Sequence, residues 1–348
     1  MKTVLNSLIL VIGLSLLSAC GDQDRALQAK FYAFGTEIDV SLYGVDEETA
    51  TKTIDALEQS FSEVNDLWHA WQPSVLTKIN DAIAAEQPIA VEDNVASVIL
   101  LAQKLAKDSG HLFNPAAGNL FALWGYEQDD WFESRPPPAQ ADIDAWLAVS
   151  PTMDDIVIEN GQLTSNNTAV RLGFGGFAKG YAVDNAIAIL QQQGIENAVV
   201  NIGGDLRAIG THGERPWIIG IRHPRHDRVL ASVAVSDDES VFSSGDYERF
   251  FTYEGKRYPH ILDPRTGYPA DQAMSSTVIH ENASMADAAA TAIFVAGSDW
   301  PTIAAEMGID MVMLVTEDGQ VEMSPAMQKR VRLTGHDAEP VIREIPHE

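Results

Sequence analysis

Three stretches of the sequence combine residue types that could bind or activate a ligand. The first is the run 173–180, Gly-Phe-Gly-Gly-Phe-Ala-Lys-Gly, between a predicted strand and a predicted helix. Glycines let the backbone approach a ligand closely, and the free N–H groups of a helix start favour an anion. Lys179 places a positive charge in the first turn, where the helix dipole alone disfavours it. The run therefore indicates a phosphate-binding turn, although a ligand-free strand–helix turn explains the glycines about equally well.

The second stretch places an imidazole beside a carboxylate. Residues 243–247 read Ser-Ser-Gly-Asp-Tyr, and the later run 258–269 carries His260 and Asp263 around a short apolar pair, just before a rigid bend. A histidine with a pKa near neutrality can accept the proton of an attacking hydroxyl, which is typically worth about 10²–10⁴ in rate. Taken alone, a hydrogen-bonded turn with a structural histidine is the slightly simpler interpretation.

The third stretch is rich in alanine, and in it Asp287 is followed four residues later by Thr291. Positions i and i+4 lie on one face of a helix, so the carboxylate and the hydroxyl point the same way. With a backbone carbonyl they would offer an all-oxygen site suited to Mg²⁺, which takes its other ligands from water and substrate phosphates. The spacing alone does not establish a metal site. The alanines carry more weight, because they leave room for a ligand or another backbone.

Length, charge and cysteine content narrow the function classes. The 348 residues suffice for one large domain or two modest ones, with an ordinary hydrophobic fraction of 45%. The formal net charge of −27 repels phosphate backbones, so we expect no nucleic-acid partner. Cys20 is the only cysteine, which excludes disulfides, thiol nucleophiles and cysteine-based metal sites from the rest of the chain.

The N-terminus has the pattern of a targeting segment. A positive second residue precedes a short apolar run over 8–17 and the sequence Leu-Ser-Ala-Cys, which ends at Cys20. The apolar run is too short to span a bilayer comfortably. The pattern resembles a bacterial lipoprotein signal and predicts a signal peptide over 1–19, lipidation of Cys20 and a tether over 20–30. A plain secretory peptide with a chance cysteine is the less favoured alternative.

The elements that must position these residues mix helices and hairpins. Helical periodicity is present in the segments 46–71, 94–107, 179–193 and 283–295. Extended segments are predicted at 31–42, 156–158, 169–172, 198–202, 217–221, 231–235, 250–253, 275–279, 311–315 and 321–323. Because no steady β-α-β alternation is present, the pattern predicts an α+β fold with largely antiparallel or mixed sheets flanked by helices.

The order of the motifs resembles the ApbE family, the FAD:protein FMN transferases. The resemblance rests on Gly-Gly-Phe-Ala-Lys-Gly-Tyr-Ala-Val-Asp, then Ser-Gly-Asp-Tyr, then His-Ile-Leu-Asp-Pro-Arg-Thr-Gly-Tyr-Pro, then Ala-Asp-Ala-Ala-Ala-Thr. The third of these motifs, which begins at His260, is the most specific. The likeness runs from about residue 34 to the last predicted hairpin.

The resemblance covers nearly the whole chain that follows the signal. It implies an ApbE-type flavin transferase domain over 31–335 with two lobes, about 31–126 and 141–335. A proline-rich loop over 127–140 is the predicted boundary between them, and residues 336–348 form a C-terminal tail.

The resemblance also implies roles for individual residues. Positions that match the flavin-dinucleotide pocket of the family are Phe34, Trp71, Leu112, Phe113, Asn114, Gly173, Lys179 and Leu262. Positions that match its magnesium ligands are Gly176 (through its carbonyl), Asp287 and Thr291, with Ala290 where some members have a further ligand. His260 matches the residue proposed as general base.

The activity that the resemblance implies is a Mg²⁺-dependent transfer of FMN from FAD to a threonine or serine hydroxyl of an acceptor protein, with release of AMP. The expected acceptors are flavoprotein subunits of membrane redox complexes. Together with the signal at Cys20, this predicts an enzyme that a lipid anchors to the inner membrane, on its periplasmic side. A tether near such complexes raises the effective concentration of enzyme and acceptor.

The chain departs from the family pattern at several positions. Gly173 stands where an aspartate is usual, Phe34 where methionine is frequent, and Asn114 where aspartate is frequent. The match at Trp71 requires a one-residue gap. Losing the aspartate removes one polar contact to FAD, so we expect weaker or differently posed binding rather than loss of function.

Three alternatives stay open on the sequence. An FAD pyrophosphatase would use water as the acceptor and release FMN and AMP. A non-catalytic FAD-binding lipoprotein would retain FAD without releasing AMP, and the departure at Gly173 motivates it. A nicotinamide dehydrogenase would use the pattern G-x-G-x-x-A at 173–178 with Glu196 as ribose-binding acid, but it requires a parallel β-α-β unit, which the hairpin signal at 160–161 disfavours.

Overall fold

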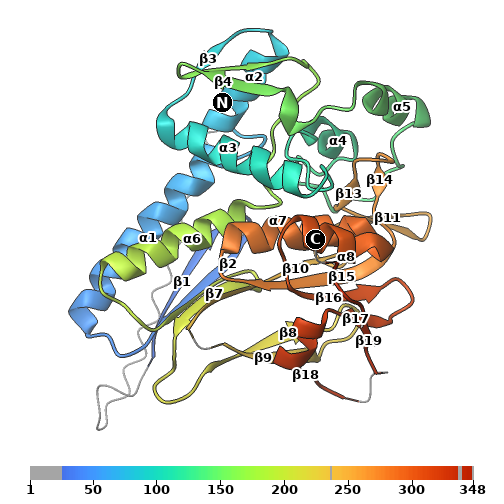
Figure 1. Cartoon of the computed structure of the whole chain (residues 1–348). Helices are drawn as coiled ribbons and strands as arrows, with labels where there is room; N and C mark the ends of the chain where they lie inside the picture. The colour runs from blue at the N-terminus through green and yellow to red at the C-terminus, as the bar shows by residue number, and fades with distance from the viewer. Residues whose placement is uncertain (1–25, 236, 336–338, 347–348) are drawn as a thin grey trace.

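A nine-stranded sheet forms the base of the molecule, and long helices lie across one of its faces (Figure 1). The computed structural model describes residues 26–235, 237–335 and 339–346. The strands, in their order across the sheet, are β1 (Leu27–Ala33), β2 (Thr36–Leu42), β6 (Ala198–Ile202), β7 (Asp205–Gly210), β10 (Asp237–Gly245), β15 (Ala273–His280), β16 (Met311–Thr316), β17 (Val321–Met323) and β19 (Val341–Ile342). Neighbours pair antiparallel except β17 and β19, which are parallel. The prediction of an α+β fold with largely antiparallel sheet is confirmed.

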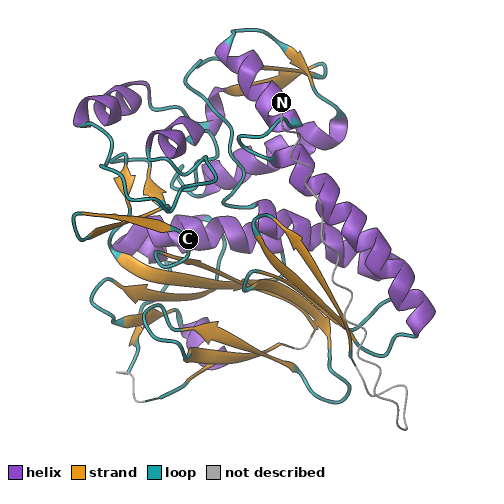
Figure 2. Ribbon diagram, turned by 180° about the vertical axis from the view of Figure 1, so that it is seen from behind, coloured by secondary structure: helices purple, strands orange, loops and turns teal. Residues whose placement is uncertain are grey.

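Three helices cover one face of this sheet: α1 (Glu47–Trp68), α6 (Ala178–Gln192) and α7 (Ala283–Ala296). Helix α7 packs on β10 and β15, α6 packs on α7, and α1 packs on α6. Helix α6 therefore lies between α1 and α7, and nearly all residues of α7 are buried. The helix-on-sheet layer therefore places α7, which carries two predicted metal ligands, in the middle of the molecule (Figure 2).

A second, smaller sheet covers the opposite face of the large one, as Figure 2 shows. It consists of β8 (Trp217–Arg222), β9 (Val229–Val235) and β18 (Val331–Leu333), with the short helix α9 (Pro325–Arg330) beside it. A separate cluster of buried aliphatic side chains from β7, β10, β15, β16 and β9 fills the space between the two sheets. Because both of its faces are covered, the large sheet acts as a rigid base for the helices.

Beyond the helix layer lies a mostly helical part of the chain (Figure 1). Its helices are α2 (Val75–Ala84), α3 (Asp93–Asp108), α4 (Gly118–Leu123), α5 (Gln140–Val149) and the short 3₁₀ helix η1 (Met153–Asp155). Its strands are β3 (Ile89–Ala90), β4 (Ile156–Glu159) and β5 (Gln162–Ser165). Beside it are the hairpins β11 (Phe250–Tyr253) with β12 (Lys256–Pro259) and β13 (Leu262–Asp263) with β14 (Tyr268–Pro269). The short helices η2 (Gly297–Asp299) and α8 (Trp300–Glu306) follow α7.

The structure corrects two of the predicted strands. The segment 31–42 is not one strand but the hairpin β1–β2, because Phe34 and Gly35 both have positive φ, +55° and +72°, and form the two-residue turn that such hairpins favour. The segment 169–172 is not a strand either: within it only Arg171 forms a bridge, to Ala117. Strands β5, β7 and β10 and helices α2, α4 and α5 were not predicted.

Strand β1 begins at Leu27, inside the segment predicted as a tether over 20–30, and the described part of the tail 336–348 adds strand β19 to the large sheet. Strands β1 and β2 precede the predicted boundary at 127–140, yet they pair in the same sheet as β6 and later strands. Cys20 and the signal segment lie outside the described residues. In the described part of the chain, no helix is both long and apolar enough to cross a membrane.

Candidate active site

Helices α6 and α7 touch main chain to main chain near their N-terminal ends. A Cβ placed on Gly180 would lie 2.3 Å from the carbonyl oxygen of Ala283, so only glycine permits this approach. The two helices also cap each other. The Gly180 N–H at the start of α6 donates to Asp287 Oδ2 (2.9 Å), while the N–H groups of Ala283 and Ser284 donate to the carboxylate of Asp184 (2.9 Å each). The sequence left open whether the small residues of α7 make room for a ligand or for another backbone. At the start of the helix they lie against the backbone of α6.

This contact brings the predicted metal positions together. A Cβ placed on Gly176 would lie 3.7 Å from Thr291 Oγ1, which in turn is 3.2 Å from Ser244 Oγ on β10. Asp287 lies one helical turn before Thr291 and is almost fully buried. Ala290 contributes no side-chain ligand, and its carbonyl accepts a hydrogen bond from Ser276 Oγ (2.6 Å). The junction therefore offers one carboxylate, hydroxyls and main chain, all of them oxygen donors.

Lys179 forms an ion pair with the buried carboxylate of Asp205, at the start of β7. Asp205 is itself fixed, because its Oδ1 accepts from the Ser243 N–H (2.8 Å). Burial alone would lower the pKa of Lys179, but the charges of Asp205, Glu248 and Asp287 outweigh it and hold that pKa above its usual value. Lys179 is thus positioned as expected near the site, but Asp205 already compensates its charge.

Lys179 faces three carboxylates, those of Asp205, Glu248 and Asp287, and Glu248 also faces the guanidinium groups of Arg249 and Arg222. Burial raises the pKa of Asp287 to about 8; the charge of Lys179 opposes this rise, and the charge of Asp205 adds to it. A divalent cation beside Asp287 would favour the ionised carboxylate. The residues present therefore fit a hard cation such as Mg²⁺.

Within the described ranges, no group of three or more histidine, aspartate or glutamate side chains could enclose a metal. A cation at the α6–α7 junction would therefore take few ligands from the chain and the others from water or a bound phosphate, as Mg²⁺ commonly does. Two hollows of about 250 and 660 Å³ lie elsewhere, near Arg225 and near Asn166, and no predicted site residue lines either of them.

His260 lies in the connection between β12 and β13, half-buried, and its backbone N–H donates to the Arg249 carbonyl oxygen (3.0 Å). Its ring Nδ1 is 3.2 Å from the same oxygen. If Nδ1 carries the proton, Nε2 is left with a free lone pair. Burial, together with the positive charges of Arg249 and Lys179, lowers the pKa of His260 to about 3. The imidazole is therefore neutral at physiological pH, with the Nε2 lone pair unprotonated, but so low a pKa makes it a weaker base than the near-neutral histidine that the sequence predicted.

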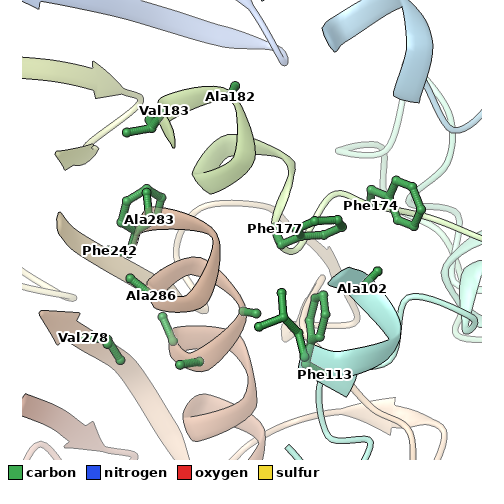
Figure 3. Packing of buried hydrophobic residues seen from close by; sticks show 14 of the residues in the cluster. Ala102, Phe113, Phe174, Phe177, Ala182, Val183, Phe242, Val278, Ala283 and Ala286 are labelled. Carbon is green, nitrogen blue, oxygen red and sulfur yellow. The ribbon is translucent and has the colours of Figure 1, made fainter. Parts of the chain in front are cut away.

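Aromatic rings form the wall beside the glycine run. Phe113 packs edge-on against Phe177, with ring centroids 5.9 Å apart, and Phe174 packs edge-on against the other side of Phe177 at 5.2 Å (Figure 3). A Cβ on Gly176 would come within 3.1 Å of the Phe113 ring. Phe113 thus lies against the glycine run, and Leu112 beside it is buried.

The remaining predicted pocket residues are less directly placed. The turn that contains Phe34 approaches the His260 region, since a Cβ on Gly35 would lie 3.4 Å from Arg249 Nη2. The amide of Asn114 is used within the chain, because its Nδ2 donates to the Pro151 carbonyl and its Oδ1 accepts from the Ala116 N–H. These two bonds fix the orientation of the Asn114 amide and leave one N–H and one lone pair of it for other partners.

Trp71 donates from Nε1 to Asp129 Oδ1 (3.3 Å), so it lies beside the loop that was predicted only as a lobe boundary. Leu262, two residues after His260, packs in an aromatic cluster with Trp124 and Phe251. Among the described residues, no hydrogen bond, ion pair or ring contact joins either side chain to the α6–α7 junction.

Sequence reasoning missed two acidic residues beside Lys179. Asp205 directly follows Gly203 and Gly204 at a tight turn, and Glu248 follows the Ser-Gly-Asp-Tyr motif by one position. Two signals could have identified them: the glycine pair before Asp205 at the start of a strand, and the position of Glu248 one residue after the second motif.

The dehydrogenase alternative is wrong. The residues before the glycine run form no strand, and α6 leads into β6, which pairs antiparallel with both β2 and β7. A dinucleotide-binding turn of that type requires a parallel β-α-β unit.

Comparison with known proteins gives one family. The sequence model of the ApbE family matches residues 34–313. The chain is similar to proteins named FAD:protein FMN transferase from Rhodobacter capsulatus (40% identical over 305 residues, 86% of this chain) and Haemophilus influenzae (30% over 344 residues, 96% of this chain). The match spans 57% of the length of the Rhodobacter protein and 99% of the Haemophilus protein.

Solved structures agree with the sequence comparison. The ApbE protein of Thermotoga maritima superimposes with a TM-score of 0.80 at 31% identity, over 88% of this chain and 100% of that chain. The flavin transferase ApbE of Vibrio cholerae superimposes with a TM-score of 0.75 at 26% identity, over 88% of this chain and 99% of that chain.

Proposed function

The chain belongs to the ApbE family, and from this premise we propose that it is an FAD:protein FMN transferase that uses Mg²⁺. The observation that carries the proposal is the α6–α7 junction, where Gly176, Asp287 and Thr291 converge beside the Lys179 charge group. A carboxylate, a hydroxyl and a main-chain carbonyl suit a hard cation and the phosphates that it carries.

Each residue of the junction then has a defined task. Asp287 and Thr291, with the main chain at Gly176, would hold the metal. When bound, Mg²⁺ would supply a positive charge that stabilises the charge developing on the departing phosphate oxygens. Lys179, kept charged by Asp205, would lie near the diphosphate as an N–H donor whose charge Asp205 largely compensates. The close helix contact at Gly180 fixes the distance between the glycine run and Asp287.

His260 would act as general base in the transfer. Its Nε2 accepts the proton of a serine or threonine hydroxyl while Nδ1–H is held by the Arg249 carbonyl. The hydroxyl oxygen forms a bond to the phosphorus on the FMN side of FAD, and the bond from that phosphorus to the bridging oxygen breaks. The products are a phosphoester-linked FMN and AMP, and no atom changes its oxidation state.

The proposal includes a place in the cell and a kind of acceptor. The lipoprotein-type signal supports anchoring through Cys20 on the periplasmic side of the inner membrane. Flavoprotein subunits of membrane redox complexes would then be the acceptors, because the anchor holds enzyme and acceptor in one surface layer.

The test is incubation of the protein with FAD, Mg²⁺ and such a subunit. Covalent flavin fluorescence on the subunit in a denaturing gel, with one AMP released per flavin attached, is the expected result. An acceptor variant that lacks the hydroxyl is the matched control and should stay dark. AMP release without labelled acceptor would identify an FAD pyrophosphatase instead, and FAD retained without AMP release would identify a flavin-binding protein.

A further inference from the structure

We propose that Glu127 is an additional FAD-binding residue, whose carboxylate accepts a hydrogen bond from FAD beside Gly173. The proposal rests on the function proposed above. Gly173 has no side chain with which to contact a ligand, and the family resemblance implies an acid at this position. A Cβ placed on Gly173 would have one heavy atom within 4 Å, namely Glu127 Oε1 at 3.9 Å. A carboxylate from another part of the chain thus borders the space that a side chain at position 173 would enter.

The carboxylate of Glu127 has unused bonding capacity. Its side chain is only 7% exposed. Oε2 lies 2.7 Å from Arg171 Nη2 as an ion pair, yet it makes no hydrogen bond of acceptable geometry, and Arg171 Nε has no partner either. Burial raises the pKa of Glu127 to about 7, while the charge of Arg171 opposes this rise. Arg171 pairs with Oε2, whereas Oε1, the oxygen that faces Gly173, has no hydrogen-bond partner among the described residues, so a ligand N–H or O–H group could donate to it.

The chain around Glu127 follows the edge of the site. The preceding residue, Tyr126, lies with its ring centroid 6.2 Å from that of His260. Two residues later, Asp129 accepts from Trp71 Nε1, and then Trp131 lies 6.0 Å from the Arg249 guanidinium. Tyr126 and the start of the predicted lobe boundary that follows it therefore border His260 and Trp71 respectively.

Glu127 is fixed in place rather than loosely attached. The hydroxyl of Tyr126 donates to the Tyr258 carbonyl, and its ring packs 5.9 Å from that of Phe251. At the other end of the contact, the Gly173 N–H donates to the Pro115 carbonyl (2.8 Å). A carboxylate held between such anchors can orient a ligand group with little entropic cost.

The chemistry of FAD supplies suitable donors. The adenine amino group, the imide N–H of the isoalloxazine ring and the hydroxyls of ribose and ribityl can each donate to a carboxylate. The backbone at Gly173 does not have the positive φ that would exclude other residues, so an aspartate is sterically allowed there. A carboxylate can therefore be supplied to this region from either position 127 or position 173.

The test uses this equivalence. The dissociation constant for FAD is measured by flavin fluorescence with Mg²⁺ and the full mature protein, without acceptor. Glu127→Gln should weaken FAD binding about tenfold, the loss expected for one charge-assisted hydrogen bond. Adding Gly173→Asp to that variant should restore most of the affinity. Glu133→Gln, at an exposed position of the same loop, is the matched control and should bind as the wild type does.

Truncated ligands separate a direct contact from a structural role. If Glu127 contacts FAD, Glu127→Gln should weaken either FMN or ADP, the fragment that carries the contacted group, and leave the other unchanged. Equal weakening of both fragments with a lower melting temperature would overturn the proposal, as would unchanged FAD binding. Wild-type protein that fails to bind FAD at all would instead refute the proposed function.

Discussion

Replacing Gly180 with alanine should separate helices α6 and α7 and misplace the predicted metal ligands. The added Cβ would lie 2.3 Å from the Ala283 carbonyl oxygen and 2.8 Å from the Ser284 Cα. Both are main-chain atoms, so no side chain can rotate away. Since non-bonded contacts are normally about 3.5–4.0 Å, the helices must move apart by about 1 Å.

The expected loss of stability is modest. Overpacking of this kind costs about 1–3 kcal/mol, and the better helix propensity of alanine returns up to about 1 kcal/mol. The free energy of unfolding should therefore fall by roughly 0–2 kcal/mol. The expected loss of activity is larger, because a 1 Å misplacement of catalytic groups can cost about 10²-fold in rate.

The assay combines urea denaturation with the rates of flavin transfer and of FAD hydrolysis, measured well below the melting temperature. Gln191→Ala, on the exposed side of the same helix, is the control and should change neither quantity. If Gly180→Ala keeps both the wild-type rates and the wild-type stability, the close contact does not position the site. A variant that loses only stability would show that α7 tolerates the shift.

Four further predictions concern three side chains. Asp287→Ala should abolish both flavin transfer and FAD hydrolysis. It should lower the free energy of unfolding by only about 1 kcal/mol, the value of one lost helix cap. Wild-type rates in Mg²⁺ would show that the metal binds elsewhere. Asp205→Asn should weaken the hold on Lys179 and lower the free energy of unfolding by about 1–3 kcal/mol in urea melts, whereas an unchanged midpoint would mean that Glu248 replaces it. His260→Gln should slow transfer by about 10²–10⁴ with FAD affinity retained, and loss of that affinity would contradict a general-base role. The pKa of His260 is about 3 in the folded protein and about 6.5 in the unfolded chain, so wild-type stability should fall as the pH drops below 6.5, by up to about 1.4 kcal/mol per pH unit. In urea melts at pH 7 and pH 5, His260→Gln should remove this part of the pH dependence.

The sequence alone determined the features that depend on the spacing of residues close together in the chain. The run 179–193 predicts α6 (Ala178–Gln192), and the run 283–295 predicts α7 (Ala283–Ala296) almost to the residue. The i, i+4 relation of Asp287 and Thr291 is a property of any single helix, so their common face needed no tertiary information. Motif order was enough to indicate the family.

Local patterns failed where neighbouring strands or turns decided the outcome. The alternation over 31–42 is the same in one strand as in two, and only the positive φ at Phe34 and Gly35 turns the chain back on itself. Strand β10 runs through the Ser-Ser-Gly motif, because β7 pairs with its first half, residues 237–241, and β15 pairs with residues 240–245. Pairing of this kind depends on partners far along the chain.

The site itself was decided by tertiary structure. The hydrogen bond from Gly180 to Asp287 joins residues 107 positions apart, and the pairing of Lys179 with Asp205 and the approach of Glu127 to Gly173 likewise join separate segments. The sequence indicates which residues are charged. Whether a lysine such as Lys179 binds a phosphate or a carboxylate depends on which elements pack beside each other in the core. The large sheet and the main-chain contact between α6 and α7 fix the distances between the site residues on these two helices. Close packing in the interior allows the two helices only one relative position.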